Sequence, residues 1–405
     1  MARTILLLGT LDTKGQEYAY VRDLITARGH DVLVMDLGIQ GEPAFAPDVS
    51  AAEVARRGGT ALEELRARGD RGTAVEVMLA GARTLAAELY EQGRFDAVLG
   101  MGGGGGTTMI TAAMRALPVG VPKVMVSTMA SGNTAPYVDV TDITLMYSVV
   151  DVAGLNPLSR RILANAAGAV CGMVEQDVPS AADRPLLAAT MFGVTTPCVD
   201  AARARLEAAG YDVLVFHATG SGGRAMEGLI RDGYFTGVLD ATTTEWCDEV
   251  VGGVLSAGPD RLTAAGRAGL PQVVSVGALD MVNFGAADTV PERFRERTLY
   301  RHNPTVTLMR TSVEECREIG RRIAERLSQA TGPVVLVLPM RGVSMLDAEG
   351  QPFDDPEADR ALFEALELHA GPGVRILEVD AHINDPVFAE TLADELLRLV
   401  SPPEE

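Results

Sequence analysis

Short runs rich in Val and Leu recur along the whole chain, and stretches with helical periodicity separate them. Buried parallel strands are typically continuous apolar runs, and parallel strands need a helical crossover between them. The pattern therefore predicts an α/β fold with doubly wound parallel sheets. The expected strands are Ile5–Gly9, Val32–Asp36, Ala97–Gly100, Lys123–Ser127, Thr144–Val150, Leu186–Met191, Val213–His217, Gly237–Asp240, Val273–Val276, Val306–Met309, Val334–Leu338 and Val374–Val379.

Part of the sequence occurs twice in the same order. Three ordered matches favour a duplicated fold over the chance similarity of any two strand–helix units. The matched segments are closer together in the sequence of the second half. The first half therefore contains an extra helical segment, roughly Ala51–Gln92. The matched pairs are Arg28–Asp36 with Ala209–His217, Phe95–Leu99 with Phe235–Leu239, and Val121–Ser127 with Leu270–Val276.

The 405 residues exceed one ordinary hydrophobic core. The polar segment Glu175–Pro185 contains two prolines and is typical of a linker. We therefore expect a Rossmann-like domain over residues 1–180 and a second one over residues 186–405. Ligands of such folds bind at the carboxyl ends of the strands, which predicts an interdomain cleft as the binding site.

Charge and composition exclude several classes of protein. The formal net charge is −20 and no cluster of Lys and Arg interrupts it, so neither nucleic acid nor an anionic membrane is an expected partner. No apolar run approaches the roughly 18 residues of a membrane span. The first residues lack the pattern of a signal peptide, and the four cysteines have no metal-type spacing. A cytoplasmic protein with reduced thiols is expected.

The most informative motif is a run of five glycines directly after an apolar strand. Phe95–Met101 is followed by Gly102, Gly103, Gly104, Gly105 and Gly106, and then by Thr107 and Thr108. Such a loop leaves bare backbone N–H groups at the start of a helix, expected here over Thr107–Ala116, where they favour a phosphate or carboxylate.

Two familiar phosphate-binding templates do not account for this run. The dinucleotide motif expects the loop after the first strand and an acidic residue at the end of the next, whereas the next strand here ends in Ser127-Thr128. The P-loop requires a lysine where this chain has Gly106. A tight turn between packed backbones is the alternative to a ligand site, and five glycines followed by two threonines favour the ligand.

Other strand ends add polar groups to the predicted cleft. Lys14 supplies a positive charge, and Asp12 either orients it or holds Mg²⁺. Capping of the helix by Asp12 or Thr13, with Lys14 in solvent, is the competing interpretation. In the second half, a small-residue loop forms either a second anion-binding lip or an ordinary strand–helix turn. The candidate ligand-contacting residues outside the glycine run are Thr10, Asp12, Thr13, Lys14, Ser127, Ser131, Thr219, Gly220, Ser221, Gly222 and Arg224.

Five segments together resemble the Tm-one-like ATP-binding family, which comprises uncharacterised bacterial and fungal proteins and the amino-terminal half of a tomato virus-resistance protein. The resemblance covers essentially the whole chain. It implies two Rossmann-like domains, ATP with Mg²⁺ as cofactors, and a homodimer. The segments are Gly9–Gly15, Met101–Thr108, His217–Gly220, Ser256–Leu262 and Pro339–Ser344.

The leading hypothesis is an ATP-binding protein that holds the ATP phosphates on Gly102–Thr108. In one form of this hypothesis it is an enzyme that acts on a small carboxylate or sugar acid in the interdomain cleft. Lys14 and Arg224 would offset phosphate charge, and Asp12 or Asp139 would place Mg²⁺. The alternative is a nucleotide-gated binding module without turnover, and a third is a two-lobed receptor for a small acid. Catalytic residues are not predicted, although the lip of Arg341 and His302 is expected to meet a second substrate.

Overall fold

The structure is a computed structural model, and it describes residues 2–178 and 183–401. Backbone contacts divide the chain into two compact units, Met1–Ser180 and Ala181–Glu405, here called unit 1 and unit 2. The central part of the predicted linker, residues 179–182, lies outside the described residues. No helix in the described ranges is long and apolar enough to cross a membrane.

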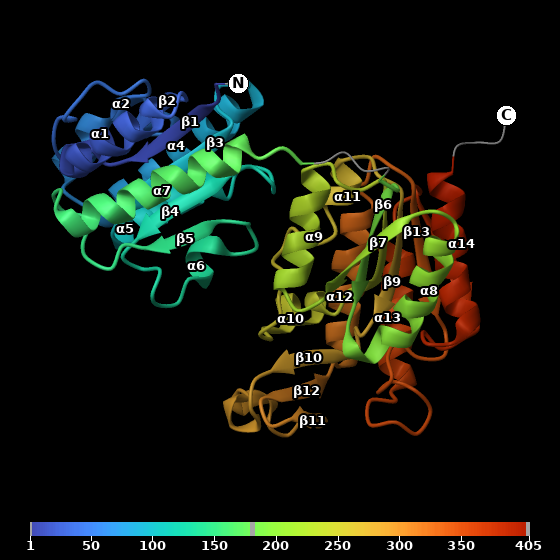
Figure 1. Ribbon diagram of the computed structural model, residues 1–405. Helices are drawn as coiled ribbons and strands as arrows, with labels where there is room; N and C mark the ends of the chain where they lie inside the picture. Colours follow the sequence, from blue (N-terminus) through green and yellow to red (C-terminus); the bar gives the residue numbers. More distant parts are fainter. Residues whose placement is uncertain (1, 179–182, 402–405) are drawn as a thin grey trace. The chain divides into compact units, whose positions relative to one another are not determined.

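Unit 1 contains one five-stranded parallel sheet with the order β2-β1-β3-β4-β5 (Figure 1). Its strands are β1 (Thr4–Gly9), β2 (Asp31–Asp36), β3 (Ala97–Gly102), β4 (Lys123–Ser127) and β5 (Thr144–Tyr147). Its helices are α1 (Leu11–Ala27), α2 (Ala51–Arg57), α3 (Leu62–Arg68), α4 (Arg71–Glu91), α5 (Gly104–Met114), α6 (Ala135–Val138) and α7 (Pro157–Glu175).

Helices cover both faces of this sheet. Ile5 and Leu7 of β1 pack against α1 and α7, whereas Leu6 and Leu8 pack against α2 to α5 on the opposite face. The alternation follows from the two-residue period of a strand, and burial on both faces explains why the strand contains no polar residue after Thr4. Because α1 and α5 lie on opposite faces, the loops that enter them diverge at the edge of the sheet.

Unit 2 contains a six-stranded parallel sheet with the order β14-β13-β9-β8-β6-β7. Its parallel strands are β6 (Leu186–Met191), β7 (Asp212–His217), β8 (Gly237–Thr242), β9 (Gln272–Gly277), β13 (Val334–Pro339) and β14 (Val374–Val379). Its α-helices are α8 (Thr196–Ala208), α9 (Ser221–Arg231), α10 (Glu245–Val251), α11 (Ala264–Arg267), α12 (Val313–Leu327), α13 (Pro356–His369) and α14 (Pro386–Val400), and its 3-10 turns are η1 (Gly193–Thr195), η2 (Ala287–Thr289) and η3 (Glu292–Phe294).

The predicted duplication is confirmed by topology. Read from β7 to β13, the sheet of unit 2 repeats the order 2-1-3-4-5 found in unit 1. The aligned strands β3 and β8 start at Ala97 and Gly237, which is the offset that the Phe95–Phe235 match predicts. The extra helical segment of the first half consists of α2, α3 and α4, whereas α9 alone connects β7 to β8 in unit 2.

One strand was assigned to the wrong sheet. Val306–Met309 was expected in the parallel sheet, but β12 (Val306–Arg310) is the centre of a separate antiparallel sheet between β10 (Met281–Phe284) and β11 (Leu299–Asn303). An apolar run alone does not distinguish the two environments. The Asn303-Pro304 pair was the missed signal, because Asn303 Oδ1 accepts the Thr305 N–H at 2.9 Å and forms the hairpin turn.

Candidate functional site

The strand order of unit 1 creates a crevice at the carboxyl edge of its sheet. The connections from β1 and β3, which are neighbouring strands, run to helices on opposite faces, and in doubly wound folds ligands bind at this switch point. A cavity of about 650 Å³ lies there, between the loops that follow β1, β2 and β3 and the start of α4. One part of its wall is apolar and is formed by Leu37, Ile39, Leu65, Ala74, Val75 and Met109.

Four glycines of the run, Gly103–Gly106, form another wall of this cavity, whereas Gly102 is the last residue of β3 and is not part of the lining. Gly103 is the N-cap of α5, and the first intrahelical hydrogen bond is donated by Thr107 N to Gly103 O at 2.8 Å. The N–H groups of Gly104, Gly105 and Gly106 therefore have no partner within the helix. The expected start of this helix at Thr107 was wrong, because the glycines themselves form its first turn.

Neither packing nor backbone conformation requires glycine over Gly103–Gly106. None of the four has a positive φ. A Cβ atom on Gly103, Gly104 or Gly105 would have its nearest neighbour at 3.8, 3.9 or 3.7 Å, and one on Gly106 would meet nothing within 4 Å. At Gly100, by contrast, a Cβ would lie 2.4 Å from a side-chain carbon of α5. The four glycines keep open a surface that the protein's own atoms do not fill.

Unit 2 fills the equivalent surface with its own side chains. The Phe95–Phe235 match places Thr242–Glu245 at the positions of Gly102–Gly105. Glu245, the first residue of α10, is completely buried, and its Oε1 accepts the N–H groups of Gly220 at 2.7 Å and Gly223 at 3.0 Å. Backbone N–H groups at this edge of unit 2 thus already hold a carboxylate.

This finding revises the second predicted lip, Thr219–Arg224. The N–H of Gly220 is occupied by Glu245, and the Thr219 hydroxyl donates to His217 O at 3.2 Å. Arg224 donates to Ser256 O at 3.2 Å. The loop is therefore a strand–helix turn closed around an internal acid, and Ser221 and Gly222 belong to the first turn of α9.

Arg261 neutralises Glu245 within a buried ion network. Its Nε donates to Glu245 Oε2 at 2.6 Å, and its Nη1 and Nη2 donate to the two oxygens of Asp240 at 2.5 and 2.6 Å. A third carboxylate, Glu227, lies 3.4 Å from Nη1 and accepts the backbone N–H groups of Leu262 and Ala264. Burial raises the pKa of Glu227. The network explains why Arg261 is buried although it is never neutral.

The loop after β1 contributes the polar groups predicted for it, but their contacts differ from the expectation. Asp12 caps no helix: its Oδ2 accepts the N–H groups of Gln40 at 3.0 Å and Gly41 at 3.2 Å, which fixes the loop after β2. Its Oδ1 is buried and has no hydrogen-bond partner in the described structure. The hydroxyls of Thr10 and Thr13 are 2.8 Å apart, and both residues line the cavity.

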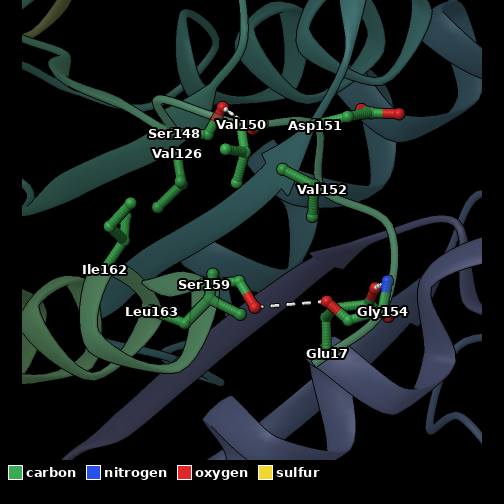
Figure 2. Close-up of a pocket in the computed structure, with 10 residues that line it drawn as sticks. All are labelled: Glu17, Val126, Ser148, Val150, Asp151, Val152, Gly154, Ser159, Ile162 and Leu163. Atoms are coloured by element: carbon green, nitrogen blue, oxygen red, sulfur yellow. Dashed lines mark hydrogen bonds between the residues drawn. The ribbon is translucent and has the colours of Figure 1, made fainter. Parts of the chain in front are cut away.

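Lys14 lines the cavity, and its side chain is also held by a segment that lies outside the lining. Its Nζ donates to Val152 O in the segment between β5 and α7. Figure 2 shows the neighbouring contacts of that segment, where the side chains of Glu17 and Ser159 converge on Gly154. Glu17 accepts the Gly154 N–H, and Ser159 donates to Gly154 O at 3.2 Å. These contacts hold the start of α1, and with it the position of Lys14.

Several other predicted residues do not line the cavity. The hydroxyl of Thr107 is buried against Ser127 at 2.7 Å, so this pair joins α5 to β4. Thr108 donates to Gly104 O at 2.9 Å within α5. Ser131 and Asp139 are exposed in the segment between β4 and β5, and the lining of the cavity includes neither of them. The structure thus does not bring Asp139 together with Asp12.

Sequence reasoning missed three charged residues that line the cavity. Arg66, Asp70 and Arg71 lie at the end of α3 and the start of α4, within the extra helical segment. Together with Lys14 and Asp12 they give the lining three cations and two carboxylates, in a chain whose formal charge is −20. The position of this segment, an insertion directly after a strand end, was the available signal.

The acids at the far strands of unit 2 form a second buried cluster. Arg310 pairs with Asp359 at 2.6 Å and with Asp347 at 3.5 Å, and Ser344 donates to Asp280 at 2.7 Å. Burial, followed by the charge of Asp347, raises the pKa of Asp280 to about 7 and that of Asp359 to about 8. The predicted lip residues Arg341 and His302 are exposed, and Arg341 pairs with Asp380 at 2.7 Å.

This cluster makes the stability of unit 2 depend on pH. Because the folded state binds protons more tightly than the unfolded state, the contribution is complete near pH 4 and is lost as the pH rises through 7 to 8. We expect the free energy of unfolding to fall between about pH 5 and pH 8 and to level off above that, and Asp359→Asn to flatten that slope. Trp246, the single tryptophan, is buried in unit 2 and reports its unfolding in urea. A stability that rises over this pH range would contradict the prediction.

Family models cover almost all of the chain. Residues 3–179 match the N-terminal domain of an uncharacterised protein family, UPF0261, and residues 184–400 match the C-terminal domain of the same family. The chain belongs to the UPF0261 family. A UPF0261 protein of Clostridium tetani is 52% identical over 402 residues, covering 99% of this chain and 100% of the relative. One of Mesorhizobium japonicum is 51% identical over 396 residues, covering 96% and 98%.

A plant protein is also similar to this UPF0261 chain. The tomato (Solanum lycopersicum) ToMV resistance protein Tm-1 is 44% identical over 337 residues, which are 81% of this chain and 45% of the tomato protein. The predicted resemblance to Tm-one-like proteins is confirmed at this level. The ATP binding that the resemblance implies stays a prediction.

Proposed function

We propose that unit 1 binds ATP with Mg²⁺, with the phosphates on Gly103–Gly106. The observation that carries the proposal is the open surface over these glycines. Three helix N–H groups there lack an intrahelical partner, and no side chain of the described residues fills the space. Backbone N–H groups and the positive end of a helix dipole favour phosphate. The resemblance to a family of ATP-binding proteins supports the same ligand.

The size and composition of the cavity fit a nucleotide. Its volume of about 650 Å³ lies within the range of small-molecule sites, which are mostly apolar with a few placed polar groups. The apolar wall of Leu37, Ile39 and Met109 suits a base, and Lys14 and Arg71 suit phosphate.

Mg²⁺ is proposed to arrive with the nucleotide. The described residues contain no group of three or more His, Cys, Asp or Glu side chains that could hold a metal alone. Mg²⁺ commonly takes its ligands from phosphate oxygens, water and one or two carboxylates. Asp12 is the carboxylate that fits, since one of its oxygens is free of hydrogen bonds. Asp139 does not fit, because the lining of the cavity does not include it.

The contacts of the lining acids favour the binding module over an enzyme that uses these residues as bases. Asp12 accepts two backbone N–H groups. Asp70 caps α4, and its hydrogen bond from the Thr73 hydroxyl, at 2.6 Å, lowers its pKa. Both acids thus hold the protein's own backbone, and the lowered pKa of Asp70 makes that carboxylate a weak general base. Binding without turnover, in which the nucleotide changes the conformation of unit 1, is therefore the version that we prefer.

The test is a thermal-shift titration with ATP, with and without Mg²⁺, followed by hydrogen exchange. A ligand at a hundredfold excess over its Kd stabilises the folded state by about 2.7 kcal/mol. We expect ATP to raise the melting temperature and to slow exchange over 102–109 and 10–15, but not over 219–224. ADP production over hours separates the enzyme from the binding module. If ATP shifts neither melting nor exchange, the proposal is wrong.

A further inference from the structure

Arg71 differs from the other cations of the cavity in unit 1. It is the first residue of α4, it is exposed, and it makes no hydrogen bond or ion pair with any residue that the structure describes. The Arg66 guanidinium, in contrast, donates to Ile39 O at 2.6 Å and to Gly41 O at 2.9 Å. Lys14 is tied to Val152 O. Among these three cations, Arg71 alone retains all its donors.

The guanidinium of Arg71 lies over the glycine surface. Its Nη2 is 3.7 Å from the position that a Cβ atom on Gly105 would take. The backbone of Arg71 is fixed by Asp70, whose Oδ1 accepts the N–H of Gly72 at 2.9 Å and whose Oδ2 binds the Thr73 hydroxyl. An anion bound to the N–H groups of α5 would therefore lie close to the guanidinium N–H donors of Arg71, whose backbone position at the start of α4 is fixed.

Unit 2 shows how backbone N–H groups at a helix start and a guanidinium together hold an anion, although from other elements. The Glu245 carboxylate is held by the N–H groups of Gly220 and Gly223 and by the guanidinium of Arg261. These N–H groups lie after β7 at the start of α9, and therefore differ from those of α5, which corresponds to α10. In unit 1 Gly105 stands at the position of Glu245, and the N–H groups of α5 lie beside a guanidinium without a carboxylate of the described residues on them. A ligand that supplies the missing negative charge would complete the arrangement.

We propose that Arg71 binds the phosphoryl group that sits on Gly104–Gly106, and that it thereby selects phosphorylated nucleotides over nucleosides. This inference rests on the proposed function. A planar guanidinium pairs with two phosphate oxygens at once, which lysine does not reproduce. The selecting residue thus comes from α4, in the helical insertion that unit 2 lacks between the corresponding strands.

The experiment measures the affinities of ATP, ADP, AMP and adenosine by titration calorimetry for the wild type, Arg71→Ala and Arg71→Lys. Arg94→Ala, an exposed arginine that does not line the cavity, is the matched control. We expect Arg71→Ala to weaken the three phosphorylated ligands on the order of ten- to a hundredfold and to leave adenosine unchanged. Arg71→Lys should be intermediate, and Arg94→Ala should match the wild type.

Two results would overturn the role of Arg71: unchanged affinities in Arg71→Ala, or an equal loss for adenosine. Unfolding curves of each variant test for a folding defect, and none is expected because the Arg71 side chain has no hydrogen bond or ion pair within the described residues. Inorganic pyrophosphate separates this inference from the proposed function. If the wild type binds pyrophosphate but no nucleotide, and Arg71→Ala abolishes that binding, nucleotide binding is wrong and Arg71 remains a phosphate ligand.

Discussion

Replacing Arg261 by methionine is expected to destabilise unit 2 by about 3–5 kcal/mol, because removing one partner of a buried ion pair leaves the other charge without compensation. Asp240 and Glu245 would lose their direct hydrogen bonds, and Glu227 would lose its nearby charge. A change of this size is a large fraction of the stability of an ordinary domain. Glu245 would keep its hydrogen bonds from Gly220 and Gly223 but would be a buried carboxylate without its neutralising cation.

Urea unfolding followed by Trp246 fluorescence measures this effect in unit 2 alone. Arg267→Met is the matched control, since Arg267 forms an exposed pair with Asp260 at 3.7 Å and such pairs contribute about 0–1 kcal/mol. Arg261→Lys keeps the positive charge but not the planar guanidinium, so its loss of stability should lie between those of Arg261→Met and Arg267→Met. This variant provides the measurement if Arg261→Met does not fold. Equal midpoints for Arg261→Met and Arg267→Met would show that the network adds no stability.

Local patterns were sufficient to predict most of the fold. Val- and Leu-rich runs located β4 and β14 to the residue, because strands buried on both faces are continuous apolar segments. The three ordered matches, among them Phe95–Leu99 with Phe235–Leu239, predicted the duplicated fold, and the shared sheet order of the two units agrees with it. Pairing between separate segments was harder to predict, and β12 is the example. Its sheet depends on pairing with β10 and β11, which the apolar run of β12 does not encode.

The sequence predicted only part of the site, because local sequence does not show which partner a polar side chain contacts in the folded protein. Gly103–Gly106 and the polar residues Thr10, Asp12, Thr13 and Lys14 do line one cavity. The sequence could not show that Thr107 turns toward Ser127, because a hydroxyl at a helix start fits a ligand or a neighbouring strand equally well. It also could not show that Gly220 is occupied by Glu245, since that contact spans 25 residues.

Replacing Gly105 by alanine is expected to stabilise unit 1 and to weaken ATP binding in the same protein. Glycine in a helix costs up to about 1 kcal/mol relative to alanine, and outside the local backbone of α5 the nearest described atom to a Cβ at this position is Arg71 Nη2 at 3.7 Å. The same Cβ would stand between the N–H groups of α5 and a phosphate, and we expect at least about a tenfold loss of affinity, or 1.4 kcal/mol.

Gly172→Ala in α7 is the matched control for this trade-off. Gly172 is also a helical glycine with open space around its Cβ position, but it lies outside the lining of the cavity. Hydrogen exchange of peptides from unit 1 should show comparable stabilisation in both variants, whereas calorimetry should show a loss of ATP affinity only in Gly105→Ala. A stabilised Gly105→Ala variant with unchanged affinity would mean that ATP does not lie on α5. The paired result tests directly whether Gly103–Gly106 are kept for a ligand, because the packing of the described residues of unit 1 leaves room for a Cβ atom at all four positions.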